Sequence, residues 1–529
     1  MSVSDCPNQI SEDLQTIANP DIYRINAFRI LQIPVTATLR EANNQMRKLT
    51  LQEKLGNNGH LDNVLLPLIP IPDADARREA YQRLENPESR LIDELFWFWP
   101  LTLGLSDSND EALEAMQHND YSEAIAIWKQ HETNASESNI SMHNLAIMYH
   151  VLALDFEQMR SNKSLTKKQS DQKREYWEQA FFRWKILLNH DGLWSRLSNR
   201  VRELDDPRLT TGVCRRLQDG LPIILLTINA KLAIRASLQN DKNEANYHME
   251  IIKKSGFNEG VIEESLRQAV AAIRDRIKVL CTNSEADAKI NPGQGDTIIQ
   301  SLVAQSNPML TTLDTVLPKR HSILDSAHDA VASAILQIAI LFSNKTKDWN
   351  KTLPLTASAM TIASSDSLHK RLEINLDVNK DNILHNTCWF CNKNPSDEKA
   401  VAVVKMHGGV KQVGTRIQWR NLNINVPRCK ECKVVHDKLL QQGKLQKTYG
   451  CLGIVAGVIL AIILGASVQS GWAAFIALVV CGIAGFVIPA LTKTKLTSAK
   501  NEEFKIAFPD VKKQETLGWV VGEKPPGVR

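Results

Sequence analysis

A stretch of 43 residues without a charged side chain constrains this chain more than any other feature. Between Tyr449 and Leu491 it forms two apolar arms of 20 residues joined by Gln-Ser-Gly, and it contains no Asp, Glu, Lys, Arg or His. A helix of 20 residues spans about 30 Å, the thickness of the hydrocarbon core of a bilayer. We therefore predict a transmembrane helical hairpin over residues 449–491, with a buried hairpin in a large soluble core as the alternative.

Lysines flank this hairpin on both sides, and its turn carries no charge. The flanking residues are Lys438, Lys444 and Lys447 before the first arm and Lys493, Lys495 and Lys500 after the second. The positive-inside rule then predicts a membrane protein with two spans and with both the N- and the C-terminus in the cytoplasm. Because the spans themselves lack charges, an anchor in the lipid bilayer fits them better than a transport path.

Length and charge set the remaining bounds. At 529 residues the chain is long enough for three or four domains. Its formal net charge of +4 gives no strong electrostatic signature of nucleic-acid binding. The first residues lack a basic start and an apolar core, so we expect no signal peptide and a flexible arm over residues 1–20.

Residues 21–100 have the pattern of a small helical module. Helical apolar spacing runs over residues 23–33, 39–55 and 73–98, and Thr38 is placed to cap the second helix. The phrases FRILQIPVTATLREANNQMRKL and REAYQRLENPESRLIDELF resemble the helices of a J domain, the DnaJ-type co-chaperone module. This resemblance covers under a fifth of the chain, and it implies a three-helix fold and a heat-shock chaperone ATPase as partner.

The trigger of a J domain is where the chain departs from that pattern. J domains carry His-Pro-Asp between their second and third helices, and this tripeptide triggers ATP hydrolysis in the chaperone. Counted back from the third helix, the position holds His60, Leu61 and Asp62; counted forward from the first, it falls at residues 54–56. His60, Leu61 and Asp62 are the candidate partner-binding residues of what we expect to be a degenerate J-like module kept for docking.

Residues 105–380 predict an all-α scaffold. Residues 111–130 resemble a tetratricopeptide unit, in which small alanines let paired helices approach closely. A polar segment over residues 282–296 predicts a loop between two later helices. The aromatic cluster at residues 96–99 predicts a seam between packed domains, with a protein-recognition patch as the alternative.

The scaffold carries no pattern typical of an active site. It has no Gly-rich phosphate loop, no HExxH and no GxSxG, so we do not predict an enzyme. His143, His150, His190 and His248 are scattered, and we assign them no partner at ligand spacing. We expect most of them to be surface or hydrogen-bonded core residues.

Two CxxC pairs predict a metal site in residues 385–440. The cysteines are Cys388 and Cys391, then, after 37 intervening residues, Cys429 and Cys432. Four thiolates satisfy a tetrahedral structural zinc ion, and the cytoplasm disfavours disulfides. Strand-like sequence at residues 400–406 and 418–426 lies between the pairs, so this segment resembles a zinc ribbon.

Residues 492–529 complete the chain as a cytoplasmic tail. They predict a short helix over residues 510–517, and Trp519 fits either the bilayer interface or a contact with the ribbon. Taken together, these features predict a membrane-anchored chaperone-like or adaptor protein that recruits protein partners. Two alternatives stay open: a membrane effector whose hairpin forms homo-oligomers and perturbs the bilayer, and a zinc ribbon that binds nucleic acid at the membrane.

Overall fold

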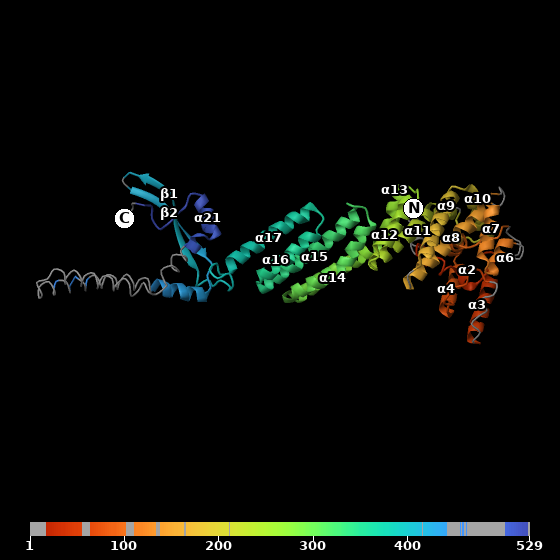
Figure 1. Ribbon diagram of the computed structural model, residues 1–529, viewed down its shortest axis with the longest axis horizontal. Helices are drawn as coiled ribbons and strands as arrows, with labels where there is room; N and C mark the ends of the chain where they lie inside the picture. The colour runs from red at the N-terminus through yellow and green to blue at the C-terminus, as the bar shows by residue number, and fades with distance from the viewer. Residues whose placement is uncertain are drawn as a thin grey trace. The chain divides into compact units, whose positions relative to one another are not determined.

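The structure is a computed structural model that describes residues 17–55, 64–101, 110–133, 138–162, 165–210, 212–414, 416–441, 455, 458–459, 462 and 503–526. The described part is mainly helical, with one small three-stranded sheet, as the sequence predicts (Figure 1). Residues 1–283 and 300–331 form one compact unit, the N-terminal unit. Residues 284–299 and 332–529 form the second, the C-terminal unit.

Helices α2 to α5 lie near the start of the described part of the N-terminal unit, and α4 packs against both α2 and α3. They are α2 (Ala27–Leu31), α3 (Leu39–Lys54), α4 (Ala74–Glu85) and α5 (Pro87–Leu95). The predicted cap at Thr38 is confirmed: Thr38 and Glu41 form a capping box at the start of α3. The helical pattern predicted over residues 73–98 is divided between α4 and α5, because Asn86 is extended before Pro87 and its side chain caps a new helix.

Pairs of neighbouring helices follow. In the N-terminal unit α6 packs on α7, α8 on α9 and α11 on α12, and in the C-terminal unit α16 packs on α17. Their bounds are α6 (Glu111–Gln117), α7 (Tyr121–His131), α8 (Ser138–Asn162), α9 (Lys167–Leu188), α10 (Asp191–Leu204), α11 (Val213–Leu238), α12 (Lys242–Lys254), α16 (Trp349–Ile362) and α17 (Asp366–Asn386). Ala112 and Ala124 are fully buried, so α6 and α7 approach closely at these small side chains.

The aromatic cluster that was predicted to form a seam between domains is buried inside the N-terminal unit. Phe96, Trp97, Phe98 and Trp99 are each at most 4% exposed. Phe98 stacks on Trp128 of α7 with ring centroids 5.5 Å apart, and Phe96 lies 5.8 Å from the ring of Trp184 in α9, centroid to centroid. The four aromatic residues therefore join α5 to the helices that follow it, and their large apolar area stabilises that joint.

The loop predicted over residues 282–296 is wrong for most of its length. Helix α13 (Glu259–Ile290) continues through it, and a short 3₁₀ turn, η2 (Pro292–Gln294), precedes α14 (Gly295–Val316). Cys281, Ser284 and Ala288 are buried at spacings of three and four residues. Burial of this stripe holds a helix in a segment whose polar composition favours a loop.

Two helices of the described residues are long and apolar enough to cross a membrane, namely α11 and α15 (Ser322–Thr346). Their most apolar windows are 72% and 56% buried within the fold, and core helices of folded domains have the same composition, so this is weak evidence for crossing. The predicted hairpin at residues 449–491 is a different segment. It lies outside the described residues except for four positions.

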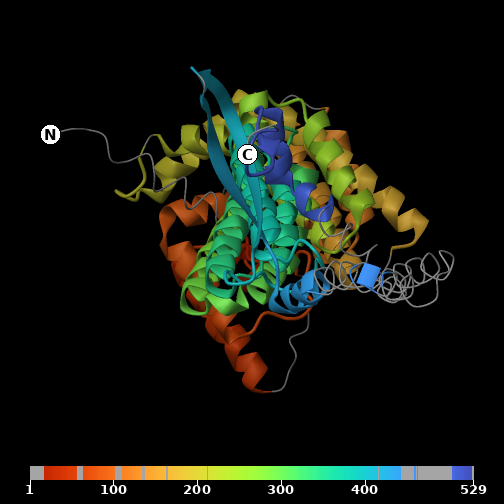
Figure 2. The ribbon, with the colours of Figure 1, turned by 90° about the vertical axis from the view of Figure 1, so that its left-hand side faces the viewer.

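The sheet lies in the C-terminal unit and has the strand order β2-β1-β3. Strands β1 (Ala402–Val413) and β2 (Arg416–Val426) pair antiparallel, from Ala402 opposite Val426 outward, with a bulge between Gly408 and Lys411. Both strands extend past the predicted bounds. Strand β3 (Val520–Val521) comes from the tail and pairs antiparallel with β1. Helix α21 (Pro509–Thr516) confirms the predicted tail helix and lies beside the sheet (Figure 2).

Candidate functional site

The four predicted metal ligands come together in the C-terminal unit. Cys388 and Cys391 follow the end of α17, while Cys429 and Cys432 lie at the start of the helix over residues 430–441. All four sulfur atoms lie within 4.8 Å of one another, and the cysteines form no disulfide. The pairing of β1 with β2 returns the chain to its starting point, and so brings the second CxxC pair beside the first.

The spacing of the sulfur atoms fits a tetrahedral metal site. Cys391 Sγ and Cys429 Sγ are 3.9 Å apart. Metal–sulfur bonds of about 2.3 Å in a tetrahedron separate neighbouring sulfurs by about 3.8 Å. Cys388 and Cys429 are buried, whereas Cys391 and Cys432 are partly exposed, so one side of the site is open to solvent. This cluster could hold a metal ion.

The surroundings of Cys391, Cys429 and Cys432 shift their pKa values in different directions. The amide of Asn394 and other donors lower the pKa of Cys391 to about 7. Burial raises the pKa values of Cys429 and Cys432, and the neighbouring sulfurs raise that of Cys432 further. A bound cation would lower the pKa values of Cys429 and Cys432 in turn, because it stabilises every thiolate that it contacts. The Cys432 amide already donates to Cys429 Sγ over 3.4 Å.

Tail residues 503–526 complete the fold around this centre. Phe508 and Val511 are fully buried in a core cluster with residues of β1 and β2, among them Met406 and Val426. Trp389 Nε1 donates to the carbonyl oxygen of Phe504 over 2.6 Å. We call residues 387–441 together with residues 503–526 the ribbon module. The predicted ribbon is thus larger than residues 385–440, because the tail supplies part of its core and its third strand.

The histidines near the cysteines take other roles. His385 Nε2 pairs with Asp510 at 3.0 Å, which with the Asp381 carbonyl raises its pKa although burial alone lowers it. His407 Nδ1 donates to the Gly522 carbonyl over 3.0 Å. His436 packs against Phe390 with ring centroids 4.7 Å apart. The three therefore tie the module together rather than joining the four cysteines.

A second cluster of ionisable groups is buried in the N-terminal unit, and the sequence analysis missed it. Glu157, Glu244 and His248 place their ligand atoms within 4.8 Å of one another. The ammonium group of Lys173 lies between the carboxylates, 2.9 Å from Glu157 and in contact with Glu244. The assignment of no partner to His248 is wrong, because Glu244 precedes it by four residues on α12.

Charge in this cluster is balanced internally. Burial alone raises the pKa of Glu157, but His248 and Lys173 outweigh it and hold that pKa at about 2. Burial alone lowers the pKa of His248, but Glu157 and Glu244 together outweigh it and raise that pKa. His248 Nδ1 donates to Asn229 Oδ1 over 3.0 Å. Because Lys173 already supplies a cation, the cluster acts as a buried ionic joint between α8, α9 and α12.

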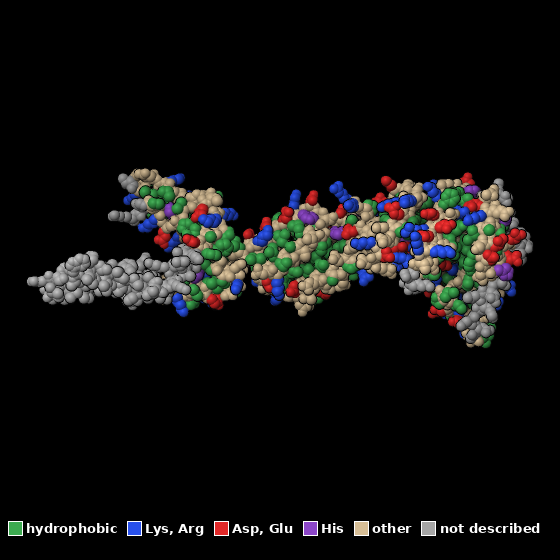
Figure 3. All heavy atoms as spheres, in the orientation of Figure 1, with side chains coloured by type: hydrophobic (Ala, Val, Ile, Leu, Met, Phe, Trp, Pro, Cys, Tyr) green, Lys and Arg blue, Asp and Glu red, His purple; other side chains and the backbone are tan. Residues whose placement is uncertain are grey.

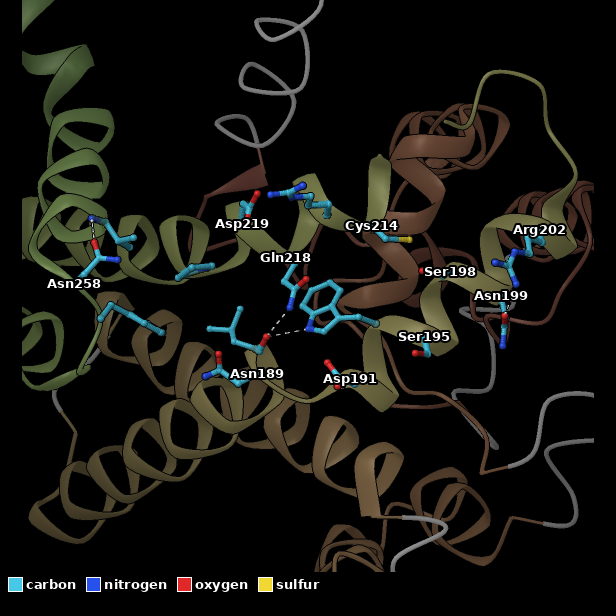
Figure 4. Close-up of a pocket in the computed structure, with 16 residues that line it drawn as sticks. Asn189, Asp191, Ser195, Ser198, Asn199, Arg202, Cys214, Gln218, Asp219 and Asn258 are labelled. Atoms are coloured by element: carbon cyan, nitrogen blue, oxygen red, sulfur yellow. Dashed lines mark hydrogen bonds between the residues drawn. The ribbon is translucent and has the colours of Figure 1, made fainter. Parts of the chain in front are cut away.

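A groove of about 1210 Å³ opens in the N-terminal unit between α10, α11 and the start of α13 (Figure 4). Trp194 lines it, and its Nε1 donates to the carbonyl oxygen of Leu188 over 3.1 Å. Gln218 Nε2 donates to the same carbonyl over 2.9 Å. Arg202 and Asp191 bring both signs of charge to the lining. A mainly polar lining that offers donors, acceptors and both charges, with apolar side chains such as Trp194 among them, suits a polypeptide segment.

The other residues singled out in the sequence lie away from the four cysteines or outside the described part of the chain. His60, Leu61 and Asp62 lie outside the described residues. His143 and His150 are buried and hydrogen-bonded, to the Leu95 carbonyl and to the Tyr23 hydroxyl, as expected of core histidines. Comparison of the chain with known protein families, with curated proteins and with solved structures gives no match.

Proposed function

We propose that this chain is a membrane-anchored adaptor with chaperone-like recruitment of protein partners at the cytoplasmic face. The two apolar arms of residues 449–491 form its anchor in the bilayer. The ribbon module, held by a structural zinc ion on its four cysteines, joins this anchor to the helical scaffold. The scaffold and the J-like module at residues 21–100 receive the protein partners, among them a heat-shock chaperone ATPase.

One observation carries the anchor: the ribbon module is built from both sides of the apolar stretch. Residues 387–441 precede that stretch and residues 503–526 follow it, yet Phe508 and Val511 share one core with Met406 and Val426. The intervening segment is therefore an insertion whose two ends return to a single folded module. Such an insertion crosses a membrane an even number of times, which supports a two-span hairpin with both flanks on one side.

Four described positions of the first arm add support. Val455, Val458, Ile459 and Ile462 are helical and 41–66% exposed. Their spacing of three, four and seven residues places them on one face of a helix. An exposed apolar face in a segment that lacks charges fits lipid better than water.

The zinc assignment follows from ligand chemistry. Four thiolates in a tetrahedral arrangement favour zinc over the harder ions that prefer oxygen. A closed set of four ligands leaves no open coordination position, so the proposed role of the ion is structural. It fixes the start of the helix over residues 430–441, which leads directly to the apolar stretch.

The recruiting half of the proposal rests on the groove in the N-terminal unit. A photo-cross-linking residue at Ser195, which is exposed and lines the groove, should capture a polypeptide in native membranes. The same residue at Gln130, exposed on α7 and away from the groove, is the matched control. Adducts no stronger at Ser195 than at Gln130 would contradict recruitment there, and an adduct of twice the chain mass would identify a homo-oligomer instead.

The anchoring half is tested by membrane extraction at alkaline pH. Replacing residues 449–491 with a Gly-Ser linker should release the chain into the soluble fraction, whereas the natural chain should stay in the pellet. The variant keeps α11 and α15, the two other helices that are long and apolar enough to cross. A variant that stays in the pellet would therefore move the anchor away from residues 449–491.

A further inference from the structure

The β1–β2 ribbon reaches well beyond the core that supports its base. At the base, Val404 and Met406 of β1 are buried. Trp519 covers the ribbon at Gly408, where a Cβ atom would come within 2.8 Å of the indole ring. Beyond that point residues 409–414 and 416–420 are exposed, except for a partly buried Trp419. We call these two ranges the arm in this subsection; this arm of the β-ribbon is distinct from the two apolar arms of residues 449–491.

Basic side chains gather on one face of the arm. Lys411 lies opposite Gln418, and Val413 lies opposite Arg416. Residues that oppose each other in an antiparallel pair share a face, and so do alternate residues of one strand. Lys411, Arg416 and Arg420 therefore share one face of the arm. The sequence from residue 402 to residue 426 contains no Asp or Glu to balance them.

These three cations also lack an ionic partner within the described residues. Lys405, nearer the base, pairs with Glu523, but none of the three on the arm forms an ion pair with any described residue. Their charge is thus available to an external anion. Neutralising it requires a surface of negative charge, because the three side chains extend over several residues of two strands.

Apolar side chains accompany the charges. Val410, Val413 and Ile417 are 50%, 56% and 43% exposed. Hydrophobic and basic side chains share the visible surface of the ribbon (Figure 3). A two-stranded ribbon is at best marginally stable in water by itself, so an arm with two exposed faces gains from a partner surface. Branched apolar side chains among cations match the boundary between lipid headgroups and acyl chains.

We infer that the arm binds anionic phospholipid headgroups at the membrane surface, a contact that rests on the proposed membrane anchor. The same basic ribbon could lie in a groove of nucleic acid. The membrane is favoured because the arm belongs to the module from which both ends of the apolar stretch emerge. Anchoring holds the arm at a high effective concentration near lipid, so weak individual contacts suffice.

The test compares the full chain in nanodiscs of phosphatidylcholine with the full chain in discs that also contain phosphatidylserine. We expect hydrogen exchange of the arm amides to slow by about tenfold in the anionic discs, and the effect to fade toward 1 M salt, where the screening length is about 3 Å. Joint replacement of Lys411, Arg416 and Arg420 by Gln should abolish the difference.

The control variant changes the same number of charges elsewhere in the C-terminal unit. Lys370, Arg371 and Lys380 are exposed on α17, and their joint replacement by Gln should leave the slowing in place. Equal exchange of the arm in both discs, in a chain that is inserted in them, would overturn the lipid contact alone. A chain that enters neither disc would overturn the anchor. Slowing caused by an added DNA or RNA duplex, and not by phosphatidylserine, would assign the arm to nucleic acid.

Discussion

Replacing Phe508 with alanine should detach the tail from the ribbon module without unfolding the helical scaffold. The Phe508 side chain is fully buried, and its ring packs edge-on against Trp389 with centroids 5.4 Å apart. Phe→Ala changes at such sites cost about 3–5 kcal/mol, through lost apolar burial and the cavity that remains. Since about 1.4 kcal/mol corresponds to a factor of ten, the open population of the tail should rise by a factor of about 10² to 4 × 10³.

Hydrogen exchange of the full chain in detergent measures this opening directly. The Gly522 amide, which donates to the Lys405 carbonyl over 2.8 Å, should lose most of its protection. Phe504→Ala is the matched control, because Phe504 is 53% exposed and contributes its backbone carbonyl, which the substitution retains. We expect that control to shift protection by less than about 0.5 kcal/mol. Equal protection of Gly522 in wild type and Phe508→Ala would refute the idea that this core holds the tail.

Three further predictions concern the metal, the J-like module and acid. Elemental analysis should find zinc in the natural chain, and Cys388→Ser should remove it and increase exchange across residues 387–441, because ligand binding stabilises this fold; zinc-free natural protein would contradict this. Stimulation of a heat-shock ATPase by the full chain should be weak, because in the proposed J-like module Leu61 stands where J domains carry the proline that restricts their trigger loop; strong stimulation that is lost in His60→Gln would contradict it. Burial lowers the pKa of His150 to about 3 from 6.5, so the unfolded chain takes up this proton first as the pH falls. Through this group, the free energy of unfolding should fall by about 1.4 kcal/mol for each pH unit between about pH 6.5 and pH 3. In thermal unfolding, His150→Asn should reduce this dependence on acid pH, and an unchanged dependence would contradict the prediction.

Local sequence signals predicted much of this architecture. The paired cysteines identified the candidate metal site because a CxxC knuckle places two thiolates on one short turn, whatever surrounds it. The Thr38 cap and the packing of the aromatic cluster at residues 96–99 could likewise be predicted from the local sequence. Two signals in the sequence were not used: Asn86-Pro87 marks a helix break, and Glu244 lies four residues before His248.

Other features depend on contacts between distant segments. Strand β3 has two residues, too few for a periodic pattern, and exists because Val520 and Val521 meet the edge of β1 more than a hundred residues earlier in the chain. The groove is lined by several helices, none of which carries a distinctive motif. Lys173 enters the buried ionic cluster from α9, and only the packing of α9 against α8 brings it to Glu157.

Protease accessibility of short tags in sealed cells tests the central claim most directly. One tag is inserted after Ser470, in the turn between the apolar arms, and others are placed at the two termini. We expect external protease to remove only the Ser470 tag, because residues 441 and 503 belong to one folded module on either side of the proposed hairpin. A C-terminal tag cut from outside, or a Ser470 tag protected until the membrane is opened, would contradict it.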